Sequence, residues 1–316
     1  MATQSLPGIK EIEDASRQIA GVASRTPLIE SRPLSRLTGR QVFLKLECFQ
    51  PIKVFKIRGA YNKVSRVKER SVVAASSGNH GIAVAYSSRL LGKKCTVVVP
   101  ETAVREKVEA IEDCQARVVK AGRSSDERDA RAREIASAEG SAFVHPFNDR
   151  DVIAGQGTCG LEITQQLADF DVVLVPVGGG GLISGISIAL KQTKAAARVV
   201  GVEPAVTPKL TAALSAKRVV RVDPARSVAD GLIPTALGGL TYLACSKYVD
   251  DALTVSEDEI IGATSAMVNT ARIFAEPSGA APLAPLLSKR GGLGDRVVLV
   301  VSGGNVSHDL LRKVLA

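Results

Sequence analysis

One lysine in an apolar segment has the surroundings that amine chemistry requires. Lys56 lies between Phe55 and Ile57, just ahead of a helical pattern. Apolar surroundings exclude water from an ammonium group and lower its pKa, which makes the amine a better nucleophile and base. Because most lysines are solvated surface charges, this segment alone does not decide its role. The motifs elsewhere in the chain must show whether Lys56 is catalytic.

Three turns rich in glycine, serine and asparagine each follow a run of β-branched residues. They span residues 76–81, 178–185 and 302–305. Such strand-to-helix turns place backbone N–H groups and a helix N-terminus at the carboxyl end of a parallel strand, where anions bind. The four consecutive glycines at 178–181 let the backbone approach a phosphate closely. The turns together predict an anionic cofactor close to Lys56.

The tetraglycine turn is also compatible with a dinucleotide site. Gly179 and Gly181 precede a helical pattern, and Glu203 follows the next expected strand, where a carboxylate could bind a ribose hydroxyl. Ser184, however, replaces the third glycine of that motif. A nicotinamide-dependent dehydrogenase is therefore a second hypothesis, in which Lys56 has no role.

Short β-branched runs alternate with helical patterns along the chain, which predicts an α/β fold with covered parallel sheets. The expected strands are 72–75, 95–99, 116–119, 141–144, 171–177 and 297–301, with helices near 104–114 and 125–139. We expect residues 71–147 to form a small lobe inserted into a large lobe of residues 1–70 and 148–316. Lys56 and the tetraglycine turn then lie in one lobe and Ser76 in the other, so the active site should occupy the cleft between them.

The composition is that of an ordinary globular protein and argues against nucleic-acid binding. The 316 residues are enough for two domains. The net charge is +9, but the basic residues are spread along the chain, aromatic residues make up 3% and tryptophan is absent. A single-stranded nucleic-acid binder would need aromatic residues on which bases can stack. The excess positive charge fits anionic small molecules better.

The cysteines and the N-terminus indicate a cytoplasmic protein. The five cysteines are odd in number and have no C-x-x-C spacing, which is typical of free thiols in a reducing compartment. The first residues have neither the basic start nor the apolar core of a secretory signal. The uncharged run from Val172 to Leu190 is long enough to span a bilayer, but Pro176 and the four glycines divide it. We therefore expect no membrane partner.

Seven short motifs occur in an order that identifies an enzyme family. They are Phe55-Lys56 with Arg58-Gly-Ala60, Ser77 to Gly81, Gly155 to Thr158, Gly178 to Gly181, Ala229 to Gly231, Glu276 to Gly279 and Ser302 to Asn305. Over nearly the whole chain they resemble the fold type II pyridoxal-phosphate enzymes, which have the tryptophan synthase β-like fold. The resemblance is strongest to the serine/threonine dehydratase and serine racemase group. It implies pyridoxal 5'-phosphate as the cofactor.

The resemblance also implies which residues bind the cofactor. Lys56 would carry it covalently, and Ser302 would face the nitrogen of its pyridine ring. The other cofactor-binding positions are Phe55, Asn79, Gly178, Gly179, Gly180, Gly181, Leu182, Gly231 and Glu276. A serine hydroxyl can donate to a neutral ring nitrogen but cannot stabilise a protonated one. This weakens the ring as an electron acceptor, which disfavours transamination and suits elimination.

On the substrate side the resemblance implies a carboxylate site and a second catalytic residue. The substrate-binding positions are Ser76, Asn79, His80 and Arg128. Ser77 matches the serine that acts as acid and base on the face opposite the lysine in racemase-like members. The same serine could instead cap the following helix.

Two positions depart from the family pattern. Val54 replaces the serine or threonine that usually precedes the Phe-Lys pair, so a phosphate contact is missing. Metal-dependent members pair a glutamate like Glu203 with an acidic residue six positions later, where this chain has Lys209. We therefore expect no metal, with Lys209 either in the place of the cation or exposed to solvent.

The expected function is elimination of water and ammonia from a small β-hydroxy amino acid such as threonine, serine or 3-hydroxyaspartate, giving a 2-oxo acid. The substrate amine would displace Lys56, which would then take the Cα proton. An amino-acid racemase that uses Lys56 and Ser77 on opposite faces is the nearest alternative. We expect a homodimer and structural or surface roles for His145 and His308.

Overall fold

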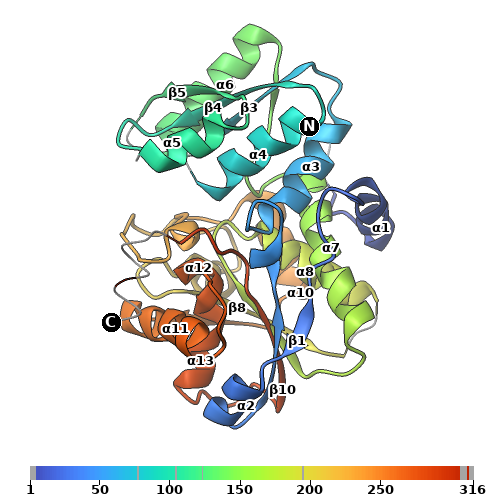
Figure 1. Ribbon diagram of the computed structural model, residues 1–316, viewed down its shortest axis with the longest axis vertical. Helices are drawn as coiled ribbons and strands as arrows, with labels where there is room; N and C mark the ends of the chain where they lie inside the picture. The colour runs from blue at the N-terminus through green and yellow to red at the C-terminus, as the bar shows by residue number, and fades with distance from the viewer. Residues whose placement is uncertain are drawn as a thin grey trace.

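The chain folds around two sheets that are separate in space and nested in sequence. The computed structural model describes residues 5–76, 78–103, 105–122, 124–193, 196–306 and 312. The four strands of the smaller sheet all lie between the second and seventh strands of the chain, which belong to the larger sheet. Figure 1 shows the two layered units one above the other, with α3 and α7 where they meet.

The larger sheet has six strands in the order β1-β2-β10-β7-β8-β9. Its strands are β1 Leu28–Glu30, β2 Gln41–Lys45, β7 Val172–Pro176, β8 Arg198–Pro204, β9 Asp251–Val255 and β10 Arg296–Val300. Only the edge strand β1 pairs antiparallel; the other described strands of this sheet are parallel. β10 therefore lies inside the sheet, between β2 and β7. Both of these strands come much earlier in the sequence.

The smaller sheet has four parallel strands in the order β5-β4-β3-β6. They are β3 Ser71–Ala75, β4 Lys94–Val99, β5 Arg117–Lys120 and β6 Ala142–Phe143. The expected α/β fold of two parallel-sheet lobes is confirmed. The expected strand at 141–144 is shorter than predicted, because only two of its residues pair with β3.

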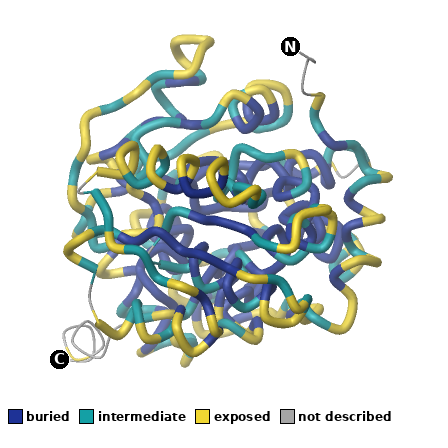
Figure 2. The backbone as a smooth tube through the Cα atoms, turned by 90° about the horizontal axis from the view of Figure 1, so that it is seen from above, coloured by how far each residue is buried: buried dark blue, intermediate teal, exposed yellow. Residues whose placement is uncertain are grey.

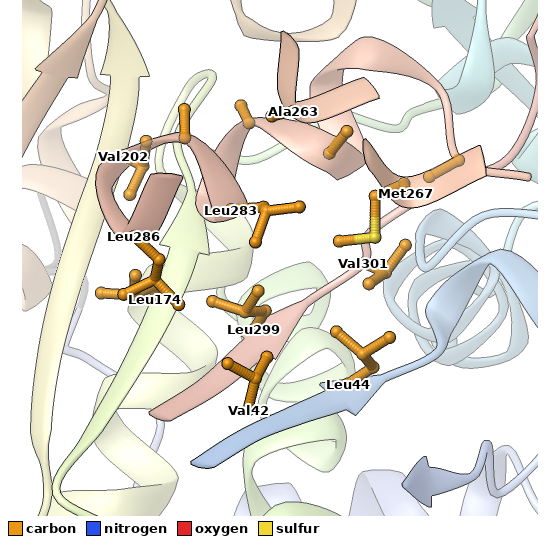
Figure 3. Close-up of a cluster of buried hydrophobic side chains, with 14 of the residues drawn as sticks. Val42, Leu44, Leu174, Val202, Ala263, Met267, Leu283, Leu286, Leu299 and Val301 are labelled. Carbon is orange, nitrogen blue, oxygen red and sulfur yellow. The ribbon is translucent and has the colours of Figure 1, made fainter. Parts of the chain in front are cut away.

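Successive side chains of a strand point to opposite faces of the sheet, and in the larger sheet they are apolar on both faces. Helices therefore cover both faces and form two hydrophobic cores. One core packs against α11 Glu257–Asn269, α12 Pro277–Ala280, η3 Ala281–Leu283 and α13 Ala284–Leu287. Figure 3 shows part of it, with side chains of the strands and of this helical layer interleaved: Val42, Leu44, Leu174, Val202, Ala263, Met267, Leu283, Leu286, Leu299 and Val301. The opposite core packs against α7 Arg150–Gln166, α8 Gly181–Gln192, α9 Lys209–Ala216 and α10 Gly239–Tyr248. Figure 2, which views the molecule from the side of the smaller unit, shows buried backbone in the middle and mostly exposed backbone around the rim.

The remaining helices complete the two units. They are α1 Ile9–Gln18, α2 Arg32–Thr38, η1 Glu47–Phe49, α3 Lys56–Arg66, α4 Asn79–Leu90, α5 Arg105–Glu112, α6 Ser125–Glu139 and η2 Asp230–Leu232. The run from Val172 to Leu190 is divided into β7, a loop and α8, as expected. Among the described residues no helix has the length and apolar character needed to cross a bilayer.

Helices α3, α7 and α8 pack closely because glycines lie at their contacts. A Cβ atom on Gly155 of α7 would lie 2.5 Å from the Arg58 carbonyl oxygen of α3. A Cβ atom on Gly185 of α8 would lie 2.3 Å from the Gly157 nitrogen of α7. The Gly155-Gln-Gly-Thr158 motif therefore brings the helix that begins with Lys56 against the body of the larger unit.

Candidate active site

Lys56 is the first residue of α3, and its side chain points to a backbone carbonyl of the segment that returns from the smaller unit. Its Nζ donates a hydrogen bond to the Pro146 carbonyl oxygen at 2.8 Å and lies 5.1 Å from the centre of the Phe55 ring. Burial lowers the pKa of Lys56 to about 8. An amine with that pKa is partly uncharged under mildly basic conditions and can act as nucleophile or base.

Two neutral histidines lie near this ammonium group. The Nε2 of His80 donates to the Val144 carbonyl oxygen at 2.9 Å, because a carbonyl can only accept. Burial and the charge of Lys56 lower the pKa of His80 to about 3. Burial and the charges of Arg133 and Lys56 lower the pKa of His145 to about 4. Neither histidine therefore adds positive charge beside Lys56 at neutral pH.

Asn79 joins the two units through a buried carboxyl group. It begins α4, and its Nδ2 donates to Glu276 Oε1 at 2.8 Å while its Oδ1 accepts from Asn305 Nδ2 at 2.8 Å. Burial raises the pKa of Glu276 to about 7. Gly303 allows this arrangement, because a Cβ atom there would lie 2.4 Å from Glu276 Oε1.

Residues 178–181 precede and open α8, and we name them the phosphate loop after the role expected of them. Gly180 has a φ of +91°, a conformation that favours glycine. Thr241 Oγ1 donates to the Gly179 carbonyl oxygen at 2.8 Å. The Phe147 ring fills the space beside the loop, because a Cβ atom on Gly179 would lie 2.2 Å from that ring. The loop thus lies at the N-terminus of α8, where backbone N–H groups and the helix dipole favour a bound phosphate.

Contacts link the remaining cofactor candidates to these groups. A Cβ atom on Gly178 would lie 2.6 Å from the Gly231 carbonyl oxygen, and the Gly231 N–H donates to Ser278 Oγ at 3.0 Å. The Phe55 N–H donates to the Ser302 carbonyl oxygen at 3.0 Å. Ser302 is buried, and no hydrogen bond joins its Oγ to another residue in the described part of the chain.

The structure says less about three further candidates on the substrate side. Ser76 Oγ accepts from the Gly78 N–H at 3.2 Å, within the turn that precedes α4. Arg128 lies in the first turn of α6, where its Nη2 donates to Ser125 Oγ at 3.0 Å. Ser77, the candidate second base, lies outside the described residues.

Lys209 is buried and not exposed to solvent. Its Nζ donates to the Leu232 carbonyl oxygen at 2.7 Å and lies 3.5 Å from Glu203 Oε2. The Glu203 carboxylate also accepts from the N–H groups of Leu210 and Thr211. An ammonium group therefore occupies the position beside Glu203. Within the part of the chain that the structure describes, no cluster of residues suited to a metal ion is present.

A buried network of charges supports α3, and the sequence interpretation gave it no role. Arg58, two residues after Lys56, is fully buried and makes bidentate bonds to both Glu47 and Glu162. Lys45 Nζ also donates to Glu162, at 2.5 Å. Arg58 belongs to a motif that the sequence shows, but its partners are distant in sequence. Sequence reasoning also missed the roles of Pro146, Phe147 and Asn305. Their contact partners, too, lie far away in the sequence.

Comparison with known proteins identifies the family. A family model described as pyridoxal-phosphate dependent enzyme matches residues 19–303. The chain belongs to this family. L-threonine ammonia-lyase of Thermotoga maritima is 40% identical over 311 residues, which cover 97% of this chain and 78% of that protein. L-threo-3-hydroxyaspartate ammonia-lyase of Saccharomyces cerevisiae is 34% identical over 306 residues, which cover 95% and 94%. The structure of maize serine racemase superposes with a TM-score of 0.93 at 31% identity, covering 98% of this chain and 97% of that one.

The family assignment answers the question that the glycine turns left open. Members depend on pyridoxal phosphate, and this decides against the nicotinamide hypothesis. The residues present fit that cofactor: a lysine whose pKa is lowered, a glycine loop at a helix N-terminus, and the buried hydroxyl of Ser302, which bonds to none of the described residues. The predicted cofactor and the predicted family are confirmed.

Proposed function

We propose that this protein is an ammonia-lyase that removes water and ammonia from a small β-hydroxy amino acid and releases a 2-oxo acid. The observation that carries the proposal is Lys56, a half-buried amine with a pKa of about 8 held beside a carbonyl acceptor. The relatives from Thermotoga maritima and yeast, both named as ammonia-lyases, support this reaction class.

The roles of the surrounding residues follow from their positions. Pyridoxal phosphate, when bound, withdraws electrons from the substrate carbon that loses its proton. Lys56 Nζ takes that proton as the base, and the Pro146 carbonyl then accepts a hydrogen bond from the ammonium that forms. We assign the cofactor to Phe55, Lys56, Asn79, Gly178, Gly179, Gly180, Gly181, Leu182, Gly231, Glu276 and Ser302. We assign the substrate carboxylate to the turn before α4 with Ser76, Asn79 and His80, and we propose Arg128 as an additional charge contact.

The test of this function is a substitution at Lys56 combined with a substrate panel. Lys56→Ala should abolish both turnover and the yellow absorbance of the attached cofactor, whereas Lys68→Ala, at an exposed lysine, should retain both. A keto-acid assay over L- and D-serine, L- and D-threonine and 3-hydroxyaspartate then identifies the substrate. A colourless wild-type protein after incubation with pyridoxal phosphate, or an active Lys56→Ala variant, would refute the proposal.

An amino-acid racemase, acting alone or alongside elimination, is the second candidate. The similarity to maize serine racemase favours it, and Ser77 supplies the hydroxyl that the second face would need. Ser77→Ala separates the roles. If activity on one enantiomer disappears while elimination of the other continues, Ser77 is a second base; if both persist, Ser77 has another role, such as capping the helix.

We further propose a homodimer and a cytoplasmic location. Phe49 and Phe274 are 54% and 59% exposed. Cys48, which precedes Phe49, and the backbone of Phe274 both lie close to Gly304, so the segments that carry the two rings are neighbours. Large exposed apolar groups mark contact surfaces. Light scattering should give twice the chain mass, and Phe49→Glu with Phe274→Glu should give the monomer; a monomeric wild type would contradict this. The five cysteines are buried and free, which supports a reducing compartment.

We also propose the lobe boundaries at residues 70/71 and 147/148. Both lie outside the strands of the two sheets, directly before β3 and shortly before α7. Limited proteolysis that releases a fragment close to residues 71–147 would support them. Cleavage inside β3 or α4 instead would not.

A further inference from the structure

We propose that His145 is a positioning residue of the active site. The unprotonated Nδ1 of its ring fixes the crossover turn, residues 144–148, which carries the chain from the smaller unit back to the larger one. The turn so fixed places the Pro146 carbonyl against Lys56 and the Phe147 ring beside the phosphate loop. The inference rests on the proposed role of Lys56.

The ring of His145 closes the crossover turn through two backbone bonds. The N–H groups of Phe147 and Asn148 both donate to His145 Nδ1, at 3.2 and 2.8 Å. A ring nitrogen accepts hydrogen bonds only when it carries no proton, so Nδ1 is the unprotonated nitrogen. A side-chain acceptor that receives two successive N–H groups fixes a turn in the way that an Asx turn does.

The surroundings keep this nitrogen free of a proton. The ring lies edge-on to Phe147, with centroids 4.6 Å apart, and to Phe143 at 6.2 Å. Burial, together with the charges of Arg133 and Lys56, lowers the pKa of His145 to about 4. The acceptor is therefore present at every pH at which the protein would work.

Residues 144, 146 and 147 of the turn contact residues of the site, and Asn148 ties the turn to α10. The Val144 carbonyl accepts from His80, and the Pro146 carbonyl accepts from Lys56. The Phe147 ring lies where a Cβ atom on Gly179 would be. Asn148 Oδ1 accepts from the Leu240 N–H at 2.8 Å, at the start of α10.

Displacement of the turn would therefore act on Lys56 and on the phosphate loop together. Loss of the two bonds to Nδ1 would free the Pro146 carbonyl and the Phe147 ring, which are adjacent in sequence. Lys56 would lose its acceptor, and water would reach Nζ. A residue that only stabilised the fold would not alter these two properties selectively.

Two substitutions distinguish the effect of losing the hydrogen-bond acceptor Nδ1 from the effect of losing the volume of the imidazole ring. Asn at position 145 can present Oδ1 close to the place of Nδ1, whereas Leu fills the space but cannot accept. His145→Leu should weaken pyridoxal-phosphate binding about ten- to thirtyfold, from the loss of two bonds of about 1 kcal/mol each. His145→Asn should stay within about threefold of wild type. In turnover, kcat of the leucine variant should fall more than its KM rises.

A second measurement examines Lys56 without the cofactor. Acetylation of the apoenzyme followed by peptide mass spectrometry gives the pH dependence of Lys56 reactivity. Its midpoint should lie near 8 in wild type and in His145→Asn, and should move towards the ordinary lysine value in His145→Leu as water enters. Circular dichroism of the apoenzymes controls for folding, and His145→Ala replaces the leucine variant if that variant does not fold.

The outcomes distinguish this inference from the proposed function. Wild-type binding and labelling by His145→Leu would overturn the positioning role while leaving the ammonia-lyase proposal intact. Equal defects in the folded leucine and asparagine variants would also overturn it, because the acceptor would then not matter. If wild type failed to take up the cofactor, the proposed function would fall, and the labelling of Lys56 would still test the turn.

Discussion

Lys56 holds its proton weakly, and this sets the pH range in which it can react. Its pKa of about 8 arises from burial, while His80 and His145 stay neutral and do not titrate in that range. Below pH 8 the protonated form predominates and cannot attack a carbonyl, so the reactive fraction falls about tenfold for each pH unit. At pH 8 about half of the amine is free, and one pH unit higher most of it is.

We therefore predict that the rate of cofactor attachment to the apoenzyme rises with pH to a midpoint near 8 and then levels off. Stopped-flow absorbance of the attached cofactor measures this rate. A rate that continues to rise beyond pH 10 would show that Nζ is solvated and has an ordinary pKa.

The residue types at the site could be predicted from the sequence better than their partners could. Lys56, Asn79, Glu276 and Ser302 stand in recognisable motifs, and their assignment to the cofactor stays a prediction. The acceptor of Lys56 is a backbone carbonyl, and every residue has one. No pattern in the sequence could therefore have singled out Pro146.

At the scale of elements, the phosphate loop depends on the absence of side chains. A Cβ atom on Gly179 would lie 2.2 Å from the Phe147 ring, closer than real Cβ contacts come. We predict that Gly179→Ala destabilises the apoenzyme by about 1–3 kcal/mol and weakens cofactor binding, because the ring or the loop must shift. Urea unfolding and a cofactor titration measure the two effects.

A glycine with open space around it provides the matched control. Gly262 lies in α11, and a Cβ atom there would meet no atom of a neighbouring described element within 4 Å. Gly262→Ala should therefore stabilise the helix by up to about 1 kcal/mol. Phe147→Leu combined with Gly179→Ala should recover part of the loss. If Gly179→Ala behaves like Gly262→Ala, the loop is not sterically constrained.

The buried network under α3 also belongs to this scale, because it joins β2, η1, α3 and α7. We predict that Arg58→Met lowers the free energy of unfolding by about 3–5 kcal/mol, since Glu47 is left buried without its cationic partner and Glu162 keeps only Lys45. Arg105→Met, at an exposed arginine, should leave the urea midpoint unchanged. A small effect of Arg58→Met would mean that both carboxyl groups become protonated or hydrated at little cost.

Most elements could be predicted, but their order in the sheets could not. The expected helix at 125–139 matches α6, and the expected strand at 297–301 matches β10 within one residue. The pattern of apolar residues in a segment indicates its burial and its secondary structure. It does not indicate which distant strand will pair with that segment. The position of β10 between β2 and β7 is therefore a result of the structure.

At the scale of the whole molecule, ion pairs join the two units. Lys107 of α5 lies 2.8 Å from Asp230 of η2, and Arg221 lies 3.3 Å from Asp126 of α6. Asp230 directly precedes Gly231, which contacts the phosphate loop. The first pair therefore connects the smaller unit to the segment of the larger one that lies beside residues 178–181.

We predict that Lys107→Ala raises KM for the amino acid by no more than about fivefold, because an exposed pair contributes less than about 1 kcal/mol. The effect should vanish in high salt, which screens the pair in wild type. Arg117→Ala, whose partner Glu139 lies in the same unit, is the control and should leave KM unchanged. A charge exchange of Lys107 and Asp230 should restore KM, and failure to do so would argue against a direct pair.

The central place of β10 has a consequence for synthesis of the protein. A ribosome completes all four strands of the smaller sheet in one continuous stretch, so that unit can fold while translation continues. The larger sheet cannot join β2 to β7 until β10 emerges, and Ser302 and the bridge between Val54 and Gly303 arrive with it. The nascent chain should therefore acquire its cofactor only after β10 and the turn that follows it have been synthesised.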